Sequence, residues 1–338
     1  MKRWYFIWLI LLVSALVLIS CAQPAPSPAQ VFKLKLHGGF PKGDPWHENL
    51  NRAWMDPLPA LSNGRLQFEE YTGGQLVAAP ELHDALSKGM IDITNTAWIW
   101  YTGTVPEASI TWLPLMYESS QQQVDVFWKV QRPIMDKLYR EKYKQVVLSM
   151  GYSSPLNIWT NKPVRKMEDL KGLKLRATGG VTSKYLQELG AGVVSMTAPE
   201  AVPALQSGAL DGVTYEASTF KTYDLYKIAP YVIYPAHIWC HVGIFWNLDS
   251  WNKLPADLQD IIMKHSEKVN YQQGQDSIAL TKKAFEEAKA RGVTVTELPK
   301  EELARWEVKA RAVWDWFAAQ SPTSKQLLTE TMKYIGKK

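Results

Sequence analysis

An arginine near the end of a short alternating segment offers the most specific chemistry in this sequence. Residues 172–180, Gly-Leu-Lys-Leu-Arg-Ala-Thr-Gly-Gly, alternate apolar and basic side chains and then break at two glycines. This alternation predicts a β-strand with Arg176 at its carboxyl end. A guanidinium presents a planar fork of donors that matches a carboxylate two-to-two. Arg176 could therefore bind a ligand carboxylate, and a structural ion pair with an acidic residue of the chain is the alternative.

Polar and aromatic side chains follow several other predicted strands and could share a site with Arg176. Trp98 has a rigid face suited to an apolar ligand, and Tyr215 supplies a hydroxyl with an apolar face. Some of the candidate residues also have an ordinary structural interpretation. Trp98 could be a core residue, His37 could be a strand-end residue whose ring nitrogens form hydrogen bonds within the protein, and Glu216 could form a surface ion pair. The predicted substrate-binding residues are His37, Asn95, Trp98, Asn157, Arg176, Tyr215 and Glu216.

Catalytic motifs are missing from the places where an enzyme would need them. Residues 47–51, His-Glu-Asn-Leu-Asn, lack the second histidine of a zinc-protease helix, and residues 179–184 have the wrong spacing for a phosphate loop. No Gly-X-Ser-X-Gly elbow occurs in the sequence. The sequence therefore predicts a binding protein without a cofactor, and an exported hydrolase is the rival class.

The elements that must position these residues follow one scheme twice. Residues 31–39 predict a strand that ends at Gly-Gly, a helix follows, and residues 63–76 predict a second strand with its own Gly-Gly. Strand and helix alternate again over residues 172–217, so we expect two similar α/β lobes with ligands at the carboxyl ends of their strands. Helical periodicity after Pro255 predicts one long helix, on the order of 50 Å, that braces both lobes.

The first thirty residues are set apart from this fold. Lys2 and Arg3 precede an unbroken apolar run, which is the layout of a secretory signal over residues 1–20. The following Leu-Ile-Ser-Cys matches a lipobox, so we predict lipidation of Cys21, with an uncleaved membrane helix as the alternative. Residues 21–30 are rich in proline, alanine and serine and predict an extended tether. The mature protein would then lie in the periplasm or at the outer face of the cytoplasmic membrane.

Length and charge narrow the class of protein further. The 338 residues exceed what one core usually organises, so two domains are expected. The 38 basic and 33 acidic residues give a formal net charge of +5, and no basic run marks a nucleic-acid surface. Cys240 has no disulfide partner if Cys21 carries lipid, and we expect it to be buried rather than nucleophilic.

Several stretches, taken in order along the chain, resemble the solute-binding proteins of TRAP (tripartite ATP-independent periplasmic) transporters. They are YTGGQLVAAPELHDALSKGMIDI, LPLMYESSQQ, NKPVRKMEDLKGLKLR, MTAPEAVPALQSGALDGV and LDSWNKLPADLQ, and the resemblance covers nearly all of residues 31–290. It implies a two-lobed periplasmic-binding-protein fold of type II, an α/β fold whose interlobe cleft closes over an organic acid. It also implies that Arg176 grips the ligand carboxylate and that a membrane permease receives the solute.

Lobe boundaries follow from the same pattern. We assign residues 31–153 and 241–280 to lobe 1, and residues 154–240 and 281–338 to lobe 2. Crossing strands near residues 153 and 241 would then join the lobes and let them close around the ligand.

Two branches of the family fit this sequence less well. A sialic-acid-binding branch has an additional arginine at the place of Leu156, and its absence weakens that assignment. A branch that binds 2-oxo acids through a metal uses ligands at places held here by Pro155, Thr214 with Tyr215, and His241, so no metal is predicted. We expect a monocarboxylate with an apolar or aromatic body. A binding module of an ATP-driven importer shares this fold and is a third class.

Overall fold

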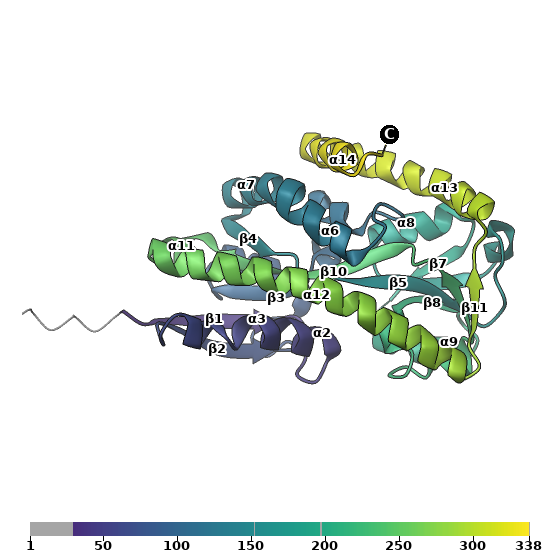
Figure 1. The fold of residues 1–338 in the computed structure, drawn as a ribbon, viewed down its shortest axis with the longest axis horizontal. Helices are drawn as coiled ribbons and strands as arrows, with labels where there is room; N and C mark the ends of the chain where they lie inside the picture. Colours follow the sequence, from purple (N-terminus) through teal and green to yellow (C-terminus); the bar gives the residue numbers. More distant parts are fainter. Residues whose placement is uncertain (1–29, 152, 197, 338) are drawn as a thin grey trace, which may run out of the picture.

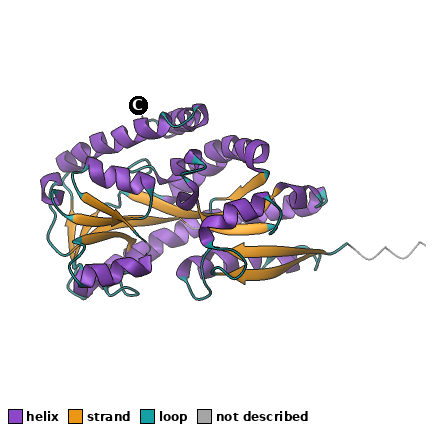
Figure 2. Cartoon of the chain, turned by 180° about the vertical axis from the view of Figure 1, so that it is seen from behind, coloured by secondary structure: helices purple, strands orange, loops and turns teal. Residues whose placement is uncertain are grey.

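Two sheets with helices on their faces divide the chain into two lobes (Figure 1). The computed structural model describes residues 30–151, 153–196 and 198–337. Among these, strands join in the order β2-β1-β3-β10-β5-β8-β6-β7, and β10 belongs to both lobes. Figure 2, from behind, shows helices on both sides of the strands. This is the α/β arrangement that the alternating pattern of the sequence predicts.

Lobe 1 is built on the parallel strands β2, β1 and β3, with β4 and the carboxyl half of β10 beside them. Strand β3 lies between β1 and β10 and is buried at every residue. The strands are β1 (Phe32–Gly38), β2 (Leu66–Thr72), β3 (Ile93–Ala97) and β4 (Gln145–Ser149). The helical segments are α2 (Pro45–His47), η1 (Glu48–Arg52), α3 (Ala53–Met55), α4 (Leu58–Leu61), η2 (Ala79–Glu81), α5 (Leu82–Ser87), η3 (Trp98–Tyr101), η4 (Pro106–Trp112), α6 (Ser120–Val126), η5 (Phe127–Gln131), α7 (Arg132–Tyr143) and α11 (Leu248–Asn252).

Lobe 2 contains the parallel strands β7, β6 and β8, followed by the antiparallel strand β5. Its strands are β5 (Ser153–Thr160), β6 (Lys174–Ala177), β7 (Gly192–Ser195), β8 (Gly212–Glu216), β9 (Tyr231–Tyr234) and β11 (Thr294–Glu297). Its helical segments are η6 (Met167–Leu170), α8 (Gly180–Glu188), α9 (Ala198–Gln206), η7 (Ala217–Thr219) and α10 (Leu225–Ile228). The predicted strand at 172–180 is therefore β6, and Arg176 is its penultimate residue.

Strand β10 (Ile238–Asn247) and helix α12 (Ala256–Ala290) connect the lobes. The first residues of β10 pair with β5, and its later residues pair with β3 and β4. Helix α12 runs for 35 residues through Gly274, about 50 Å at 1.5 Å per residue, and crosses both lobes in Figure 1. It packs on α6 of lobe 1 and on β5 and η7 of lobe 2. The long bracing helix that the periodicity predicts is present.

The last two helices return across the molecule. Helix α13 (Lys300–Ala318) packs on α8 of lobe 2, whereas α14 (Pro322–Ile335) packs on η4 and η5 of lobe 1. Gln131 of η5 donates to the hydroxyl of Thr331 at 3.0 Å, which fixes α14 there. Helix α14 thus lies against lobe 1, although the sequence placed residues 281–338 with lobe 2. The other lobe boundaries stay predictions.

Candidate functional site

The carboxyl ends of the parallel strands of the two lobes point toward each other along β10. Ala97, the last residue of β3, pairs with Val242. On the other side, Glu216 at the end of β8 pairs with Leu156, which in turn pairs with Ile238. Val242 and Ile238 are four residues apart, or about 13 Å along an extended strand. The carboxyl ends of the parallel strands of both lobes therefore lie near each other along β10, at the edge where α/β sheets usually bind ligands.

Arg176 is held by three contacts with neighbouring parts of lobe 2. Its Nε donates to the carbonyl of Met196 at 3.0 Å, and its Nη1 donates to the carbonyl of Thr214 at 3.0 Å. The guanidinium carbon lies 5.0 Å from the centre of the Tyr215 ring, in a cation–π contact. Arg176 is only 4% exposed, and its Nη2 donates no hydrogen bond to the described residues. The strands thus fix the guanidinium while leaving one donor group available.

The charge of Arg176 has no paired carboxylate in the described part of the chain. No described acidic oxygen lies within 4.0 Å of its nitrogens. Burial lowers the pKa of Arg176, whereas the nearby Tyr215 and Glu216 act to raise it. A buried charge is strongly disfavoured unless an opposite charge and hydrogen bonds compensate it. The structural ion pair considered from the sequence is therefore not found among these residues, and the arrangement suits an anion.

Tyr215 and Asn157 lie on the same face of the lobe 2 sheet as Arg176. They pair with each other across β8 and β5, and the Tyr215 ring stacks on Tyr223 with 4.8 Å between ring centres. Nδ2 of Asn157 donates to the carbonyl of Ile233 at 2.9 Å. Its buried Oδ1 has no hydrogen-bond partner among the described residues. The fold therefore brings together three of the predicted residues, whose sequence separation is large.

Glu216 ends the same strand but faces the opposite side of the sheet from Tyr215. It is 7% exposed, and the thiol of Cys240 donates to its Oε1 at 3.3 Å. Burial raises the pKa of Glu216, although the Cys240 hydrogen bond and the charge of Arg176 act to lower it. Glu216 is thus not in the exposed ion pair that was its ordinary alternative. Cys240 is buried, as the sequence led us to expect.

His37 is the penultimate residue of β1, and Asn95 is the middle residue of β3, in lobe 1. His37 Nε2 accepts the backbone N–H of Leu76 at 3.2 Å, and Asn95 Oδ1 accepts that of Gly39 at 3.2 Å. Burial lowers the pKa of His37, which favours a neutral ring with its proton on Nδ1. That Nδ1 and the Nδ2 of Asn95 are buried and have no partner among the described residues. Lobe 1 therefore holds two buried side-chain donors without a described partner, one near the end of β1 and one in the middle of β3.

Trp98 takes a different position from the other predicted residues. It is fully buried in the core of lobe 1, with its ring centre 4.9 Å from that of Phe245 and 5.2 Å from that of His241. Gly243 passes so close that a Cβ on it would lie 1.5 Å from Trp98 Nε1. This packing favours the core alternative for Trp98 over the prediction that its face covers a ligand.

Sequence reasoning missed a group of partly exposed aromatic side chains in lobe 1, namely Phe40, Trp46 and Trp100. The ring of Phe40 lies 6.2 Å from that of Trp46 and 5.1 Å from that of Trp100. Burial raises the pKa of both Glu216 and Tyr223, and the charge of Asp44, in the same loop as Phe40, adds to both increases, so the loop lies on the side of lobe 1 toward lobe 2. The sequence could have indicated this group, because Phe40 directly follows the first Gly-Gly, at the carboxyl end of a predicted strand where ligands are expected.

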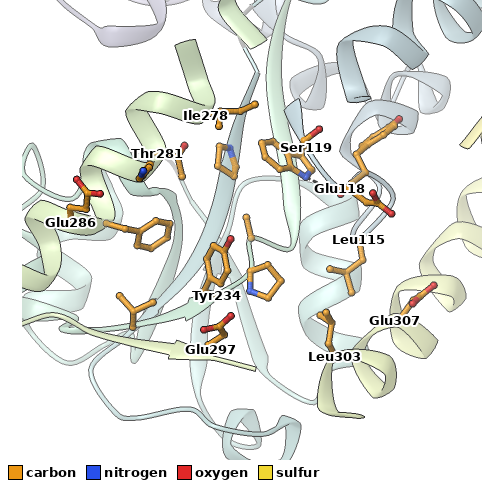
Figure 3. Close-up of a pocket in the computed structure, with 18 of the residues that line it drawn as sticks. Leu115, Glu118, Ser119, Tyr234, Ile278, Thr281, Glu286, Glu297, Leu303 and Glu307 are labelled. Atoms are coloured by element: carbon orange, nitrogen blue, oxygen red, sulfur yellow. Dashed lines mark hydrogen bonds between the residues drawn. The ribbon is translucent and has the colours of Figure 1, made fainter. Parts of the chain in front are cut away.

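A groove of about 760 Å³ lies apart from this site, between α12, β9, β11 and α13 (Figure 3). Tyr234 and Glu286 line it, and none of the predicted site residues does. Helix α12 has a second side that faces the loop after β8, because Glu287 forms an ion pair with Lys221 there. The groove is therefore distinct from the strand ends around Arg176.

Comparison with known proteins decides the class of this molecule. Residues 37–321 match the family model described as bacterial extracellular solute-binding protein, family 7. The chain belongs to this family. The TRAP solute-binding proteins among its relatives bind solutes for transport, so this protein is a transport receptor and not an enzyme. The resemblance seen in the sequence and the two-lobed periplasmic-binding fold are confirmed.

Three relatives illustrate how far this solute-binding protein resembles known ones. A solute-binding protein from Albidiferax ferrireducens is 25% identical over 323 residues, which cover 89% of this chain and 91% of that protein. A monocarboxylate 2-oxoacid-binding periplasmic protein from Nostoc is 27% identical over 221 residues, 62% of this chain and 58% of that protein. A TRAP solute-binding protein from Rhodoferax ferrireducens, crystallised with malonate, is 22% identical with a TM-score of 0.79, covering 90% and 98% of the two chains.

Two further findings concern metals and membranes. Within residues 30–151, 153–196 and 198–337, no three His, Cys, Asp or Glu side chains are grouped so that they could hold a metal ion. None of the described helices has the length and apolar character needed to cross a membrane. Cys21, the predicted lipidation site, and the predicted signal at residues 1–20 lie outside the described residues.

Proposed function

We propose that this TRAP solute-binding protein captures an organic acid with one carboxylate and an apolar or aromatic body, and delivers it to a TRAP-type permease. The observation that carries the proposal is that Arg176 is buried without a carboxylate partner among the described residues. The residue is 4% exposed, and its guanidinium donates hydrogen bonds to backbone carbonyls alone and has no described carboxylate within 4.0 Å. A ligand carboxylate on Nη2 and the outer edge of Nη1 would supply the missing charge.

The other polar groups around the cleft have separate roles in this proposal. The hydroxyl of Tyr215 and the unpaired Oδ1 of Asn157 contact the ligand from lobe 2. The unpaired donors of His37 and Asn95 contact it from lobe 1. Glu216 acts through the electrostatic field at Arg176, because it faces the opposite side of β8. Trp98 is left out of the binding set.

The body of the ligand follows from the remaining lining. Phe40, Trp46 and Trp100 from lobe 1 and Tyr223 from lobe 2 offer apolar faces. The acidic Asp44 and Glu216 would repel a second carboxylate near Arg176. The name of the Nostoc relative specifies monocarboxylates, whereas the Rhodoferax relative holds malonate, which has two carboxylates. Titration with matched compounds that carry one or two carboxylates distinguishes these two classes of ligand.

Thermal-shift and calorimetric titrations with matched compounds test the proposal. Phenylacetate, phenylmalonate and phenylacetamide share an aromatic body and carry one, two and no carboxylates. A ligand that binds only the native state raises the melting temperature, and we expect phenylacetate to give the largest increase. Arg176→Ala should weaken its binding by about 2 to 5 kcal/mol, roughly thirty- to several-thousand-fold. Arg176→Lys should recover only part of this loss, because an ammonium lacks the planar fork.

Arg291→Ala is the matched control for this test. Arg291 also lies over a tyrosine ring, 4.9 Å from the centre of Tyr226, but it is exposed. Its loss should leave binding unchanged. Wild-type affinity in Arg176→Ala, with circular dichroism showing a native fold, would contradict the role of Arg176. Tighter binding of phenylmalonate would contradict the choice of a monocarboxylate.

The membrane anchor is a separate part of the proposal. The lipobox before Cys21 supports removal of residues 1–20 and attachment of acyl chains to the cysteine. Intact-mass measurement of the protein purified from its native membranes should show both changes. A mature chain that has lost Cys21, or that carries it without added lipid, would contradict the anchor and leave the binding function unaffected.

A further inference from the structure

The two lobes touch at the third Gly-Gly of the chain, Gly179 and Gly180. Gly179 follows β6, and a Cβ built on it would lie 2.5 Å from Cγ1 of Ile99 and 3.4 Å from its Cδ1. Ile99 belongs to η3, at the end of β3 in the other lobe. The φ angle of Gly179 is 171°, which is extended backbone that any residue adopts. The glycine is therefore needed for space rather than for backbone conformation.

Ile99 has little freedom to move away from Gly179. Its β-branched side chain has a stiff χ1 angle, and it is 3% exposed. The carbonyl of Ile99 accepts a hydrogen bond from the hydroxyl of Thr102 at 3.2 Å. The Tyr101 hydroxyl, in the same turn, donates to the carbonyl of Ala79 at 2.9 Å. A methyl group on Gly179 would therefore have to displace lobe 1 as a body.

This contact lies three residues after Arg176, about 10 Å of extended chain at most. We propose that Gly179 is a positioning residue for lobe closure, whose missing side chain lets Ile99 seat on the end of β6 and bring lobe 1 over Arg176. The inference rests on the proposed function, because closure matters only if a ligand is captured in the cleft. It adds a residue that holds no ligand and acts through the approach of the lobes.

A disulfide across the same contact reports lobe closure without any ligand. A Cβ on Gly180 would lie 4.0 Å from Oγ1 of Thr102, so a small approach of the two segments would bring cysteine side chains at these two positions to the Cβ–Cβ spacing of a disulfide, roughly 3.5 to 4.5 Å. The pair Thr102→Cys with Gly180→Cys should therefore cross-link under a mild oxidant, and the rate is followed by mass. Each single variant reports any reaction with the chain's own Cys21 or Cys240. Failure of the pair to cross-link would overturn the contact in solution.

Adding Gly179→Ala to this pair tests the proposal itself. Overpacking of this kind should slow cross-linking by about five- to 150-fold. Ile99→Ala removes both crowding carbons and should restore the rate in the double variant. Gly103→Ala is the matched control, because a Cβ there would meet nothing within 4 Å, and it should leave the rate unchanged. A merely structural role would lower stability in urea without this pattern of rescue.

The outcomes separate this inference from the proposed function. An unchanged cross-linking rate in Gly179→Ala, or slowing that Ile99→Ala does not relieve, would overturn the positioning role. Neither result bears on whether Arg176 binds a carboxylate. Conversely, Arg176→Ala placed in the cysteine pair should still cross-link, because the contact at Ile99 does not involve the guanidinium. Loss of cross-linking in that variant would also count against an independent role for Gly179.

Discussion

Each lobe has a parallel strand with a pair of glycines at its carboxyl end, Gly38 and Gly39 at β1 and Gly179 and Gly180 after β6, and different parts of the molecule enclose these two pairs. In lobe 1, a Cβ on Gly39 would lie 2.8 Å from the ring of Trp100, a side chain of the same lobe. In lobe 2, Gly179 is crowded by Ile99, which belongs to the opposite lobe. The space beside Gly39 is therefore filled by a side chain of the same lobe, whereas the space beside Gly179 is filled only when the lobes meet. We call these two strand ends the junction of lobe 1 and the junction of lobe 2.

Polar groups at the two junctions differ in the same way. Asn95 and His37 of lobe 1 each accept a backbone N–H of their own lobe. Arg176 of lobe 2 has backbone partners for two nitrogens but no described partner for its charge. A site that binds an anion and then closes needs this asymmetry, because one surface must be ready before the ligand arrives and the other must remain incomplete.

The largest effect that we expect concerns two histidines at the start of β10, His237 directly before the strand and His241 within it. Burial lowers the pKa of both His237 and His241 to about 3, whereas an unfolded histidine titrates near 6.5. Below pH 6.5 the unfolded state therefore binds protons that the folded state does not. Stability should be fully present above that pH and decline toward pH 3. At pH 5 we expect the free energy of unfolding in urea to fall by about 2 kcal/mol per histidine.

His237→Phe isolates one of these contributions. Both ring nitrogens of His237 lack a described hydrogen-bond partner, and the ring stacks on Trp306 with 4.7 Å between centres. The variant should be at least as stable as wild type at pH 7 and should lose about 2 kcal/mol less at pH 5. His241 is less suitable, because its Nε2 lies 2.9 Å from the Thr111 hydroxyl. Equal acid sensitivity in variant and wild type would place the sensitive region outside this part of β10.

Most of the fold, but only part of the site, could be predicted from the sequence. Local alternation and glycine pairs mark β1, β2 and β6, and a continuous helical period marks α12. Strand β3 is buried at every residue, so it has no alternation between buried and exposed positions. The sequence therefore does not indicate whether Trp98, which directly follows β3, faces the core or a ligand. The partners of Arg176 are backbone carbonyls of Met196 and Thr214, which depend on strand neighbours far along the chain. Phe40 lies on a loop and Trp46 in the three-residue helix α2, and neither position has a periodic signal in the sequence.

Alanine at each junction tests the comparison directly. Gly39→Ala should lower the free energy of unfolding in urea by about 1 to 2 kcal/mol, because the added methyl overpacks lobe 1 against Trp100. Gly179→Ala should leave it within about 0.5 kcal/mol, since the lobes can separate without unfolding. Trp100→Ala should relieve part of the first effect. Similar losses for both glycine variants would show that the junctions do not differ as proposed.

No effect on ligand affinity is expected for Trp98, whose place in the core of lobe 1 supports the turn that carries Ile99. Its Nε1 has no described hydrogen-bond partner, so Trp98→Phe removes no such bond and keeps an aromatic ring among Phe127, Phe245 and His241. We expect a loss of about 1 kcal/mol in stability, from the smaller ring. Calorimetric titration with phenylacetate should show an unchanged affinity. A tenfold weaker affinity at unchanged stability would instead mean that the indole reaches the ligand, and that lobe 1 contributes an aromatic wall from its core as well as from its surface loop.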